Sequence, residues 1–289
     1  MAKIESEDSY LQDILKDKLY YQIPIYQRPY QWTEENCEKL LDDLFFNYED
    51  DREGDYFCGS LVLVKSDPRS KTEIYDIVDG QQRLSTFILL AKVLATLFLE
   101  RLTEESKDYL QESLITKYGK KDRLNFNAIG FNSKKDFQYA LTSFSDAPIS
   151  NNKNNYLKNA VCLKNYLEKK EIEDINDFIK WLYHKVMFIK TTCPNVSMAL
   201  RIFSVLNARG LPLQAIDVFK VELLKKLAKE KDQEEFVSRW NALSQKCSDN
   251  DLAIETLFSW YLNYLNPVTS REKMEKGLLL GLKILIKPH

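Results

Sequence analysis

The pattern of apolar and polar positions predicts a strand that passes directly into a buried helix near residue 80. Residues 74–78 alternate and are rich in β-branched side chains, whereas residues 85–99 form a long apolar run typical of a buried helix. Gly80 lies at the junction, where glycine tolerates a positive φ and lets a ligand approach the backbone. The N–H groups of the first helical turn, with the Arg83 guanidinium and the Asp79 carboxylate, predict a site for a phosphate and a metal ion. The alternative is an ordinary Asp-Gly turn before a solvated helix start.

An extended segment rich in aromatic and amide side chains precedes this junction in the chain. Prolines at positions 24 and 29 exclude a helix interior from residues 20–32. The side chains of interest there are Tyr26, Gln27, Arg28, Tyr30, Gln31 and Trp32. Two interpretations remain open: an edge strand with exposed aromatic residues, or a pocket wall that stacks on a base and hydrogen-bonds to it.

The other patterns before residue 100 predict a small mixed sheet with helices. Strands are expected near residues 20–26, 56–64 and 73–78, and the last two should form an antiparallel pair because a Ser-Asp-Pro turn connects them. A short helix is expected over residues 9–18. Thr33 is expected to cap a second helix, whose first turn carries two glutamates.

Beyond residue 99 the pattern changes to charged helices joined by Asn-rich connections, with one short strand expected at residues 186–192. A helix over residues 197–209 should end at the following glycine. Arg209, at the end of that helix, either complements the helix dipole or contributes to a site, and both interpretations stay open. We therefore expect an α+β fold, with a mixed-sheet core at residues 1–100 and a mainly helical region at residues 101–289.

Composition narrows the class of protein. Of the 289 residues, 44% are hydrophobic and 12% aromatic, which is ample for a packed core. Lys and Arg number 41 against 43 Asp and Glu, so no global positive charge would drive nonspecific DNA binding. The five cysteines have no paired spacing, which argues against a disulfide framework or a zinc site and favours the reducing cytoplasm. No signal peptide or membrane-spanning run is evident, so neither secretion nor a membrane is expected.

Three stretches together resemble one protein family. Residues 23–32 (IPIYQRPYQW), 78–86 (VDGQQRLST) and 203–220 (FSVLNARGLPLQAIDVFK) match its IPxYQRxYxW, DGQQRLTT and FxxLNxxGxxL…D..K segments in order and spacing. The family is the N-terminal domain of GmrSD-type (type IV) restriction enzymes and related phage-defence proteins, whose core is similar to the ParB/sulfiredoxin fold. The departures are small, such as Ser85 where threonine is usual.

The resemblance implies a module that binds and hydrolyses a nucleoside triphosphate with Mg²⁺, senses modified DNA and controls a nuclease. Asp79 and Arg83 are the expected catalytic residues, and Asp79 would also hold the metal. The residues expected to bind the nucleotide are Arg28, Gly80, Gln81, Gln82, Arg83, Ser85, Asn207 and Arg209, the last two returned to the pocket by residues 207–220. The residues expected to sense DNA are Tyr26, Gln27, Tyr30, Gln31 and Trp32. No P-loop occurs, so we expect slow turnover, and the base is not specified.

A nuclease centre of the HNH type needs histidines, and the chain has two, His184 and His289. Neither has a neighbour at metal-ligand spacing, and His184 is expected to be a packing or surface residue. The nuclease should therefore come from a missing domain or from another chain, and a homo-oligomer is left open. Two alternatives to an NTPase also remain: a nucleotide-dependent DNA clamp that does not hydrolyse, and a scaffold for a nuclease subunit.

Overall fold

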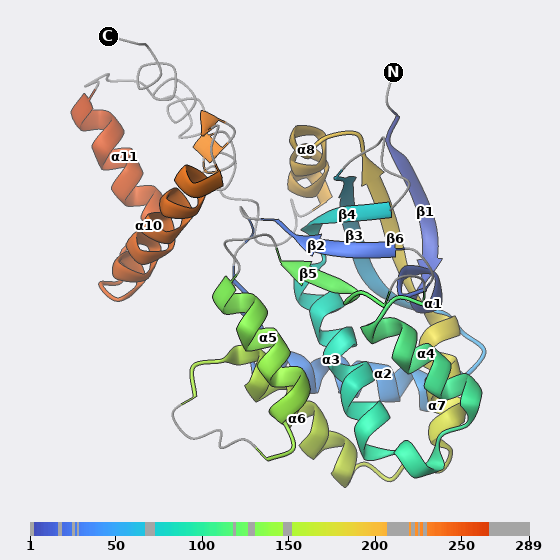
Figure 1. Cartoon of the computed structure of the whole chain (residues 1–289). Coiled ribbons are helices and arrows are strands. Elements are labelled where there is room, and N and C mark those ends of the chain that lie inside the picture. Colours follow the sequence, from blue (N-terminus) through green and yellow to red (C-terminus); the bar gives the residue numbers. More distant parts are fainter. Residues whose placement is uncertain are drawn as a thin grey trace. The chain divides into compact units, whose positions relative to one another are not determined.

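The computed structural model describes residues 3–16, 19–24, 27, 29–66, 73–117, 120–126, 131–146, 152–206, 220, 223–224, 226–227 and 230–265 (Figure 1). The chain divides into two compact units, Met1–Ala199 and Leu200–His289. The first contains a mixed sheet and most of the helices. The α+β class predicted from the sequence is confirmed.

One six-stranded sheet organises the first unit, with strand order β1-β6-β3-β4-β2-β5. The strands are β1 (Glu5–Tyr10), β2 (Leu19–Ile23), β3 (Tyr56–Lys65), β4 (Glu73–Asp79), β5 (Leu124–Phe126) and β6 (Val186–Cys193). β3 and β4 form the predicted antiparallel pair, whereas β3 and β6 run parallel, as do β2 and β4. The predicted strand near residue 186 is thus an interior strand of the sheet, between β1 and β3. Because β5 and β6 follow residue 100, the sheet extends beyond the expected core of residues 1–100.

The N-terminal stretch differs from the expected helix over residues 9–18. The structure has strand β1 up to Tyr10 and then a helix of four residues, α1 (Leu11–Ile14). The polar sequence of β1 has no apolar alternation, and its extended state is fixed by antiparallel pairing with β6, where Ser6 lies opposite Thr191. The extended conformation of β1 is therefore determined by a partner strand far away in the sequence, and the local pattern does not predict it.

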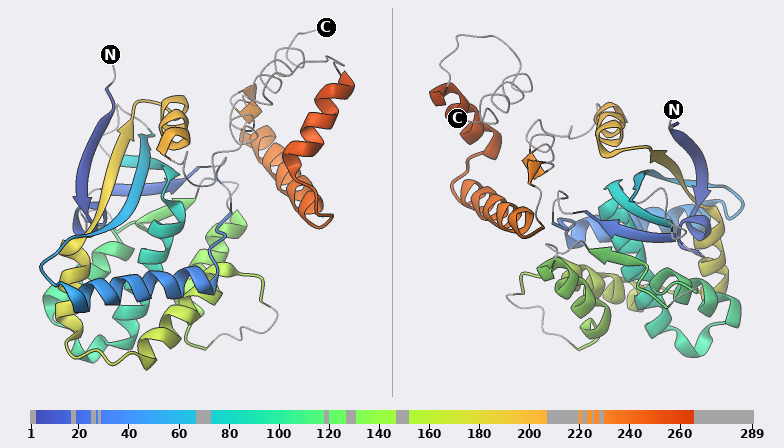
Figure 2. Two further views of the ribbon diagram at one scale, coloured as in Figure 1. Left: turned by 180° about the vertical axis from the view of Figure 1, so that it is seen from behind. Right: turned by 45° about the horizontal axis from the view of Figure 1, so that its top comes forward.

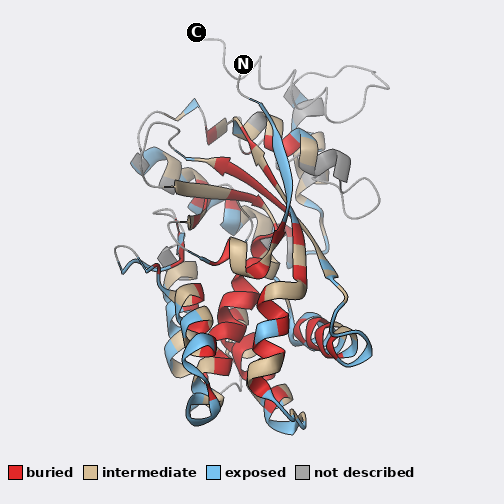
Figure 3. Cartoon of the chain, turned by 90° about the vertical axis from the view of Figure 1, so that its right-hand side faces the viewer, coloured by how far each residue is buried: buried red, intermediate tan, exposed pale blue. Residues whose placement is uncertain are grey.

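Helices gather on one face of the sheet and bury its apolar side (Figures 1 and 2). They include α2 (Glu34–Asp50), α3 (Gln81–Leu97), α4 (Glu104–Leu114), α6 (Asn155–Lys169) and α7 (Ile175–Lys185), with α5 (Phe131–Ser143) packed against α6. α3 is the innermost helix, as its apolar sequence predicts, and eleven of its seventeen residues are buried. Figure 3 shows buried residues concentrated where the helices meet the sheet. The start of α3 is thereby held firmly against the end of β4.

Thr33 is the N-cap residue of α2, as predicted, and its backbone N–H donates to Asn36 Oδ1 at 2.9 Å as part of a capping box. After β6 comes α8 (Val196–Leu206), which begins where the sequence predicts a helix, whereas the predicted end at Gly210 lies outside the described residues. The second unit contains α10 (Glu230–Ser248) and α11 (Ile254–Leu265), joined by stacking of Trp240 on Phe258 at 5.2 Å. In the described part of the chain, no helix is long and apolar enough to cross a membrane.

Candidate functional site

The junction between β4 and α3 has the geometry that the sequence predicts. β4 ends at Asp79, Gly80 has φ +92°, and α3 begins at Gln81. A Cβ at position 80 would lie 2.8 Å from Leu61 Cδ1 and 3.1 Å from the Ser60 carbonyl oxygen, so both conformation and space require glycine. No side chain caps the helix. Its first-turn N–H groups, at the positive end of the helix dipole, therefore suit an anion.

The Arg83 guanidinium is aimed by the backbone of β3. Its Nη1 donates to the carbonyl oxygens of Ser60 at 3.1 Å and Cys58 at 3.3 Å. Gly59, between them, has φ +121°, and a Cβ there would collide with Nη1. Nε and Nη2 make no hydrogen bond to any residue that the structure describes. The arginine is thus oriented by one nitrogen and keeps donors for a ligand.

Asp79 lies beside this arginine and is held by Ser60. The Ser60 hydroxyl donates to Asp79 Oδ2 at 3.0 Å, and the Gly80 N–H also donates to the carboxylate. Burial raises the pKa of Asp79, while the positive charge of Arg83 and these hydrogen bonds oppose the rise. The site therefore contains a partly buried carboxylate of elevated pKa next to a cation.

The segment expected to sense DNA lies against this site. The Gln27 side chain donates through Nε2 to the carbonyl oxygens of Ile77 and Val78, at 2.8 and 2.7 Å. In the other direction, Gln82 Oε1 accepts the N–H groups of Gln31 and Trp32, at 2.9 and 3.1 Å. Two glutamine side chains thus bind the two motifs to each other, and the Gln82 amide is used to hold chain rather than left free for a ligand.

Tyr30 is buried, with 5% of its surface exposed. Its hydroxyl lies 2.7 Å from Thr86 Oγ1 and accepts a hydrogen bond from Asn159 Nδ2 at 2.8 Å. Its ring stacks on Tyr156, with centroids 4.2 Å apart. Tyr30 therefore packs the segment onto the helices, whereas Gln31 is exposed and Trp32 half-buried. Gln31 and Trp32 thus keep exposed surface, and their contact with DNA stays a prediction.

The two glutamines of the motif face different ways. Gln81 and Ser85, one turn apart on α3, are both buried, beside the Tyr156 hydroxyl on α6. Burial raises the pKa of that hydroxyl, and its contacts with Ser85 and Gln81 oppose the rise. A ligand at the helix start would therefore meet the backbone of Gln81 rather than its side chain. Four further predicted site residues, Tyr26, Arg28, Asn207 and Arg209, lie outside the described residues.

Several residues that support the site carried no signal in the sequence. Ser60 and Gly59 belong to a strand that reads as apolar, and Asn159 is a single amide on the buried face of α6. A polar residue in an otherwise apolar helix stripe is the one available hint, because buried polar groups need partners. The role of each depends on a contact with a distant part of the chain, which local pattern does not reveal.

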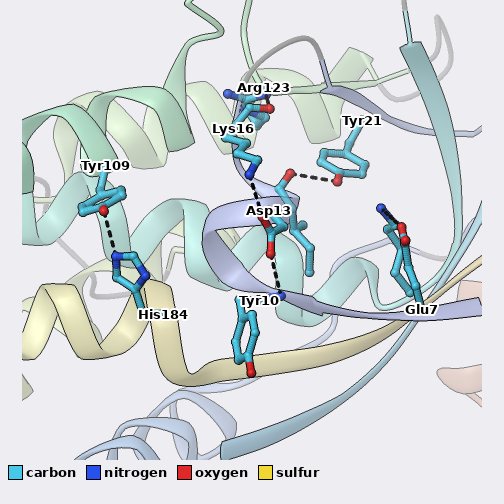
Figure 4. A network of polar contacts seen from close by, with 10 residues as sticks. Glu7, Tyr10, Asp13, Lys16, Tyr21, Tyr109, Arg123 and His184 are labelled. Atoms are coloured by element: carbon cyan, nitrogen blue, oxygen red, sulfur yellow. Dashed lines mark hydrogen bonds and ion pairs between the residues drawn. The ribbon is translucent and has the colours of Figure 1, made fainter. Parts of the chain in front are cut away.

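Farther from the junction, two polar side chains stabilise the packing (Figure 4). Arg123 is fully buried and donates to the backbone carbonyls of Lys16 at 3.1 Å and, through Nε, of Glu112 at 2.9 Å. His184 Nε2 lies 2.8 Å from the Tyr109 hydroxyl, so this histidine has a partner within the helical layer. Arg123 joins α4 to the chain between α1 and β2, and His184 joins α7 to α4, so neither lines the β4–α3 junction.

The comparison with known families supports the resemblance carried by the three motifs. The family model for the GmrSD restriction endonuclease, N-terminal domain, matches residues 11–224, a range that contains all three motif stretches. No curated protein matches the chain. Membership in this family makes a chain a component of a restriction, or phage-defence, system, and implies association with DNA and a nuclease partner. Because the match covers well over half of the sequence, this chain belongs to the GmrSD restriction endonuclease N-terminal domain family.

Proposed function

We propose that this chain binds and hydrolyses a nucleoside triphosphate at the β4–α3 junction, as the regulatory module of a modification-dependent restriction system. The observation that carries the proposal is the orientation of Arg83 by two carbonyl groups of β3, beside an uncapped helix start and a carboxylate. A cation beside a row of helix N–H groups suits a phosphate chain.

Each group has a role in phosphoryl transfer, which requires mainly positioning and charge stabilisation. The N–H groups of the first turn of α3 would bind phosphate oxygens, and Nε and Nη2 of Arg83 would add charge-assisted hydrogen bonds. Asp79 would position Mg²⁺ or the attacking water. The described residues include no group of three or more metal-ligating side chains, so Mg²⁺ would take its other ligands from the triphosphate and water. The family resemblance also assigns nucleotide contacts to Arg28, Asn207 and Arg209.

The DNA-sensing part of the proposal rests on Gln31 and Trp32, whose side chains reach the surface next to the motif. The formal net charge is −2, so such contacts would read shape and hydrogen bonds with little neutralisation of phosphates. Binding should therefore be weak and only modestly dependent on salt. The nuclease under control would be another domain or another chain.

Phosphate release with each of the four ribonucleoside triphosphates and Mg²⁺, together with calorimetry, tests the proposal. Arg83→Ala should weaken triphosphate binding by one to two orders of magnitude, because a hydrogen bond to a charged group contributes about 1.5–3 kcal/mol. Arg239→Ala is the matched control, since Arg239 is exposed and forms an ion pair with the surface residue Glu235. Equal affinity in the two variants would refute the site.

The same measurements separate the alternatives. Binding without phosphate release would favour a nucleotide-dependent clamp on DNA. Absence of binding for all four triphosphates would leave a scaffold for the nuclease. Phosphate release that is unchanged by unmodified, methylated, glucosylated and phosphorothioated DNA would remove the sensor from the proposal.

A further inference from the structure

The Pro29–Trp32 segment is held against α3 by the side chain of Gln82. Gln82 Oε1 accepts both backbone N–H groups at the end of the segment, and Nε2 lies 3.4 Å from the Pro29 carbonyl oxygen. Gln82 is in the first turn of α3, directly before Arg83. The amide that holds the segment therefore belongs to the same helical turn whose N–H groups form the proposed phosphate site.

Asn159 holds the same segment from the opposite side. Its Nδ2 donates to the Tyr30 hydroxyl and to the Trp32 carbonyl oxygen, both at 2.8 Å. Asn159 is fully buried, and its Oδ1 makes no hydrogen bond within the described part of the chain. A buried amide with an unsatisfied oxygen is costly, so the position is explained by its two donor contacts.

The segment thus bridges α6 and α3 through the side-chain amides of Asn159 and Gln82, and the Tyr30 hydroxyl adds a contact to Thr86 on α3. Asn155, one turn before Asn159, adds a weaker contact from Nδ2 to the Tyr30 carbonyl oxygen at 3.4 Å. Stacking of Tyr30 on Tyr156 fixes the middle of the bridge. Displacement of the segment would remove two donors from Gln82 and leave the Asn159 donors without acceptors. Its position and the geometry of the first turn of α3 are therefore coupled.

We propose that Gln82 and Asn159 are positioning residues that lock the Pro29–Trp32 segment onto α3, and that this lock couples a ligand on the segment to the triphosphate site. The coupling rests on the proposed function. A ligand that moves Gln31 or Trp32 must disturb the bonds to Gln82 Oε1, and with them the turn that carries Arg83. If a ligand on the segment changes the affinity for the triphosphate by some factor, the triphosphate must change the affinity of the segment for that ligand by the same factor.

Hydrogen exchange of the full chain, followed by mass spectrometry of peptides that cover residues 29–36, measures the lock directly. Gln82→Leu removes the acceptor of two N–H groups, so exchange there should accelerate about tenfold. Gln82→Glu keeps an acceptor oxygen for both N–H groups and loses only the longer Nε2 contact to the Pro29 carbonyl oxygen, so exchange should stay close to that of the wild type. Gln111→Leu, at an exposed site on α4, is the matched control and should change nothing.

Calorimetry with ATP and with GTP, each with Mg²⁺, measures the coupling. Gln82→Leu should weaken binding about tenfold, whereas Gln111→Leu should leave it unchanged. Asn159→Leu is a substitution on α6 that removes the two donors, and it should also accelerate exchange over residues 29–36. If this variant fails to fold, exchange in the two Gln82 variants still tests the lock. Exchange in Gln82→Leu equal to that in Gln111→Leu would overturn the lock. A faster exchange with no triphosphate binding by the wild type would overturn the proposed function and the coupling while leaving the lock in place.

Discussion

Replacement of Gly59 by alanine tests whether β3 aims the Arg83 guanidinium. The substitution has two effects: φ +121° is unfavourable for alanine, and the new Cβ collides with Arg83 Nη1. Backbone strain of this kind costs about 1–3 kcal/mol. The collision displaces the end of a flexible side chain, so its cost is the loss of the hydrogen bonds to Cys58 and Ser60 rather than a rigid clash.

The two effects differ in what they change. Strain lowers the melting temperature by about 2–12 °C, because 1 kcal/mol corresponds to about 2–4 °C for a unit of 150–250 residues. Displacement of the guanidinium lowers triphosphate affinity by about tenfold to a hundredfold, the value of one hydrogen bond to a charged group. Calorimetry of unfolding and of binding measures them separately.

A double-mutant cycle with Arg83→Ala separates strain from misplacement. In the Arg83→Ala background the guanidinium is absent, so Gly59→Ala should still lower the melting temperature but should no longer affect binding. Gly54→Ala is the matched control, because the Cβ it adds meets the flexible side chain of Asp51. If the affinity losses of Gly59→Ala and Arg83→Ala simply add, β3 does not aim the arginine and the reasoning is wrong.

Three further substitutions test other parts of the structure. Arg123→Met leaves buried carbonyl groups unpaired and should lower the free energy of unfolding by about 3 kcal/mol or more in urea titrations, whereas Arg239→Met should change it little. Tyr30→Phe removes the hydroxyl between Thr86 and Asn159 and should cost about 1–2 kcal/mol, and a loss below the error of the titration would contradict that network. Burial raises the pKa of Asp79 above that of the unfolded chain, so its contribution to the free energy of unfolding should fall as the pH rises from about 4 through the folded pKa. Asp79→Asn should remove that decline, and identical pH profiles for the two proteins would show that the carboxyl is not perturbed.

The parts of the fold that the sequence predicted are those fixed by local chemistry. The β4–α3 junction follows from a β-branched run, a glycine and an apolar run, each of which limits the backbone on its own. The antiparallel pairing of β3 with β4 follows from a short turn between two strand patterns. Strand β1 was missed because its residues are polar and their extended state depends on β6, more than 170 positions away in the chain.

The sequence alone could not show that Gln81 is buried while Gln82 holds the Pro29–Trp32 segment, because these roles depend on contacts with distant parts of the chain. Gln81 and Ser85 are four positions apart and therefore share one helix face, whereas Gln82 lies about 100° further round the helix. An amphipathic helix would have indicated which of these faces points inward, because polar residues elsewhere along it would mark the solvent side. α3 is buried on nearly every side, and Lys92 is the one charged residue after Arg83 in the helix. The sequence of α3 therefore hardly shows which face of the helix points inward. The packing of α6 and of the Pro29–Trp32 segment decides which amide is buried and which one holds the chain.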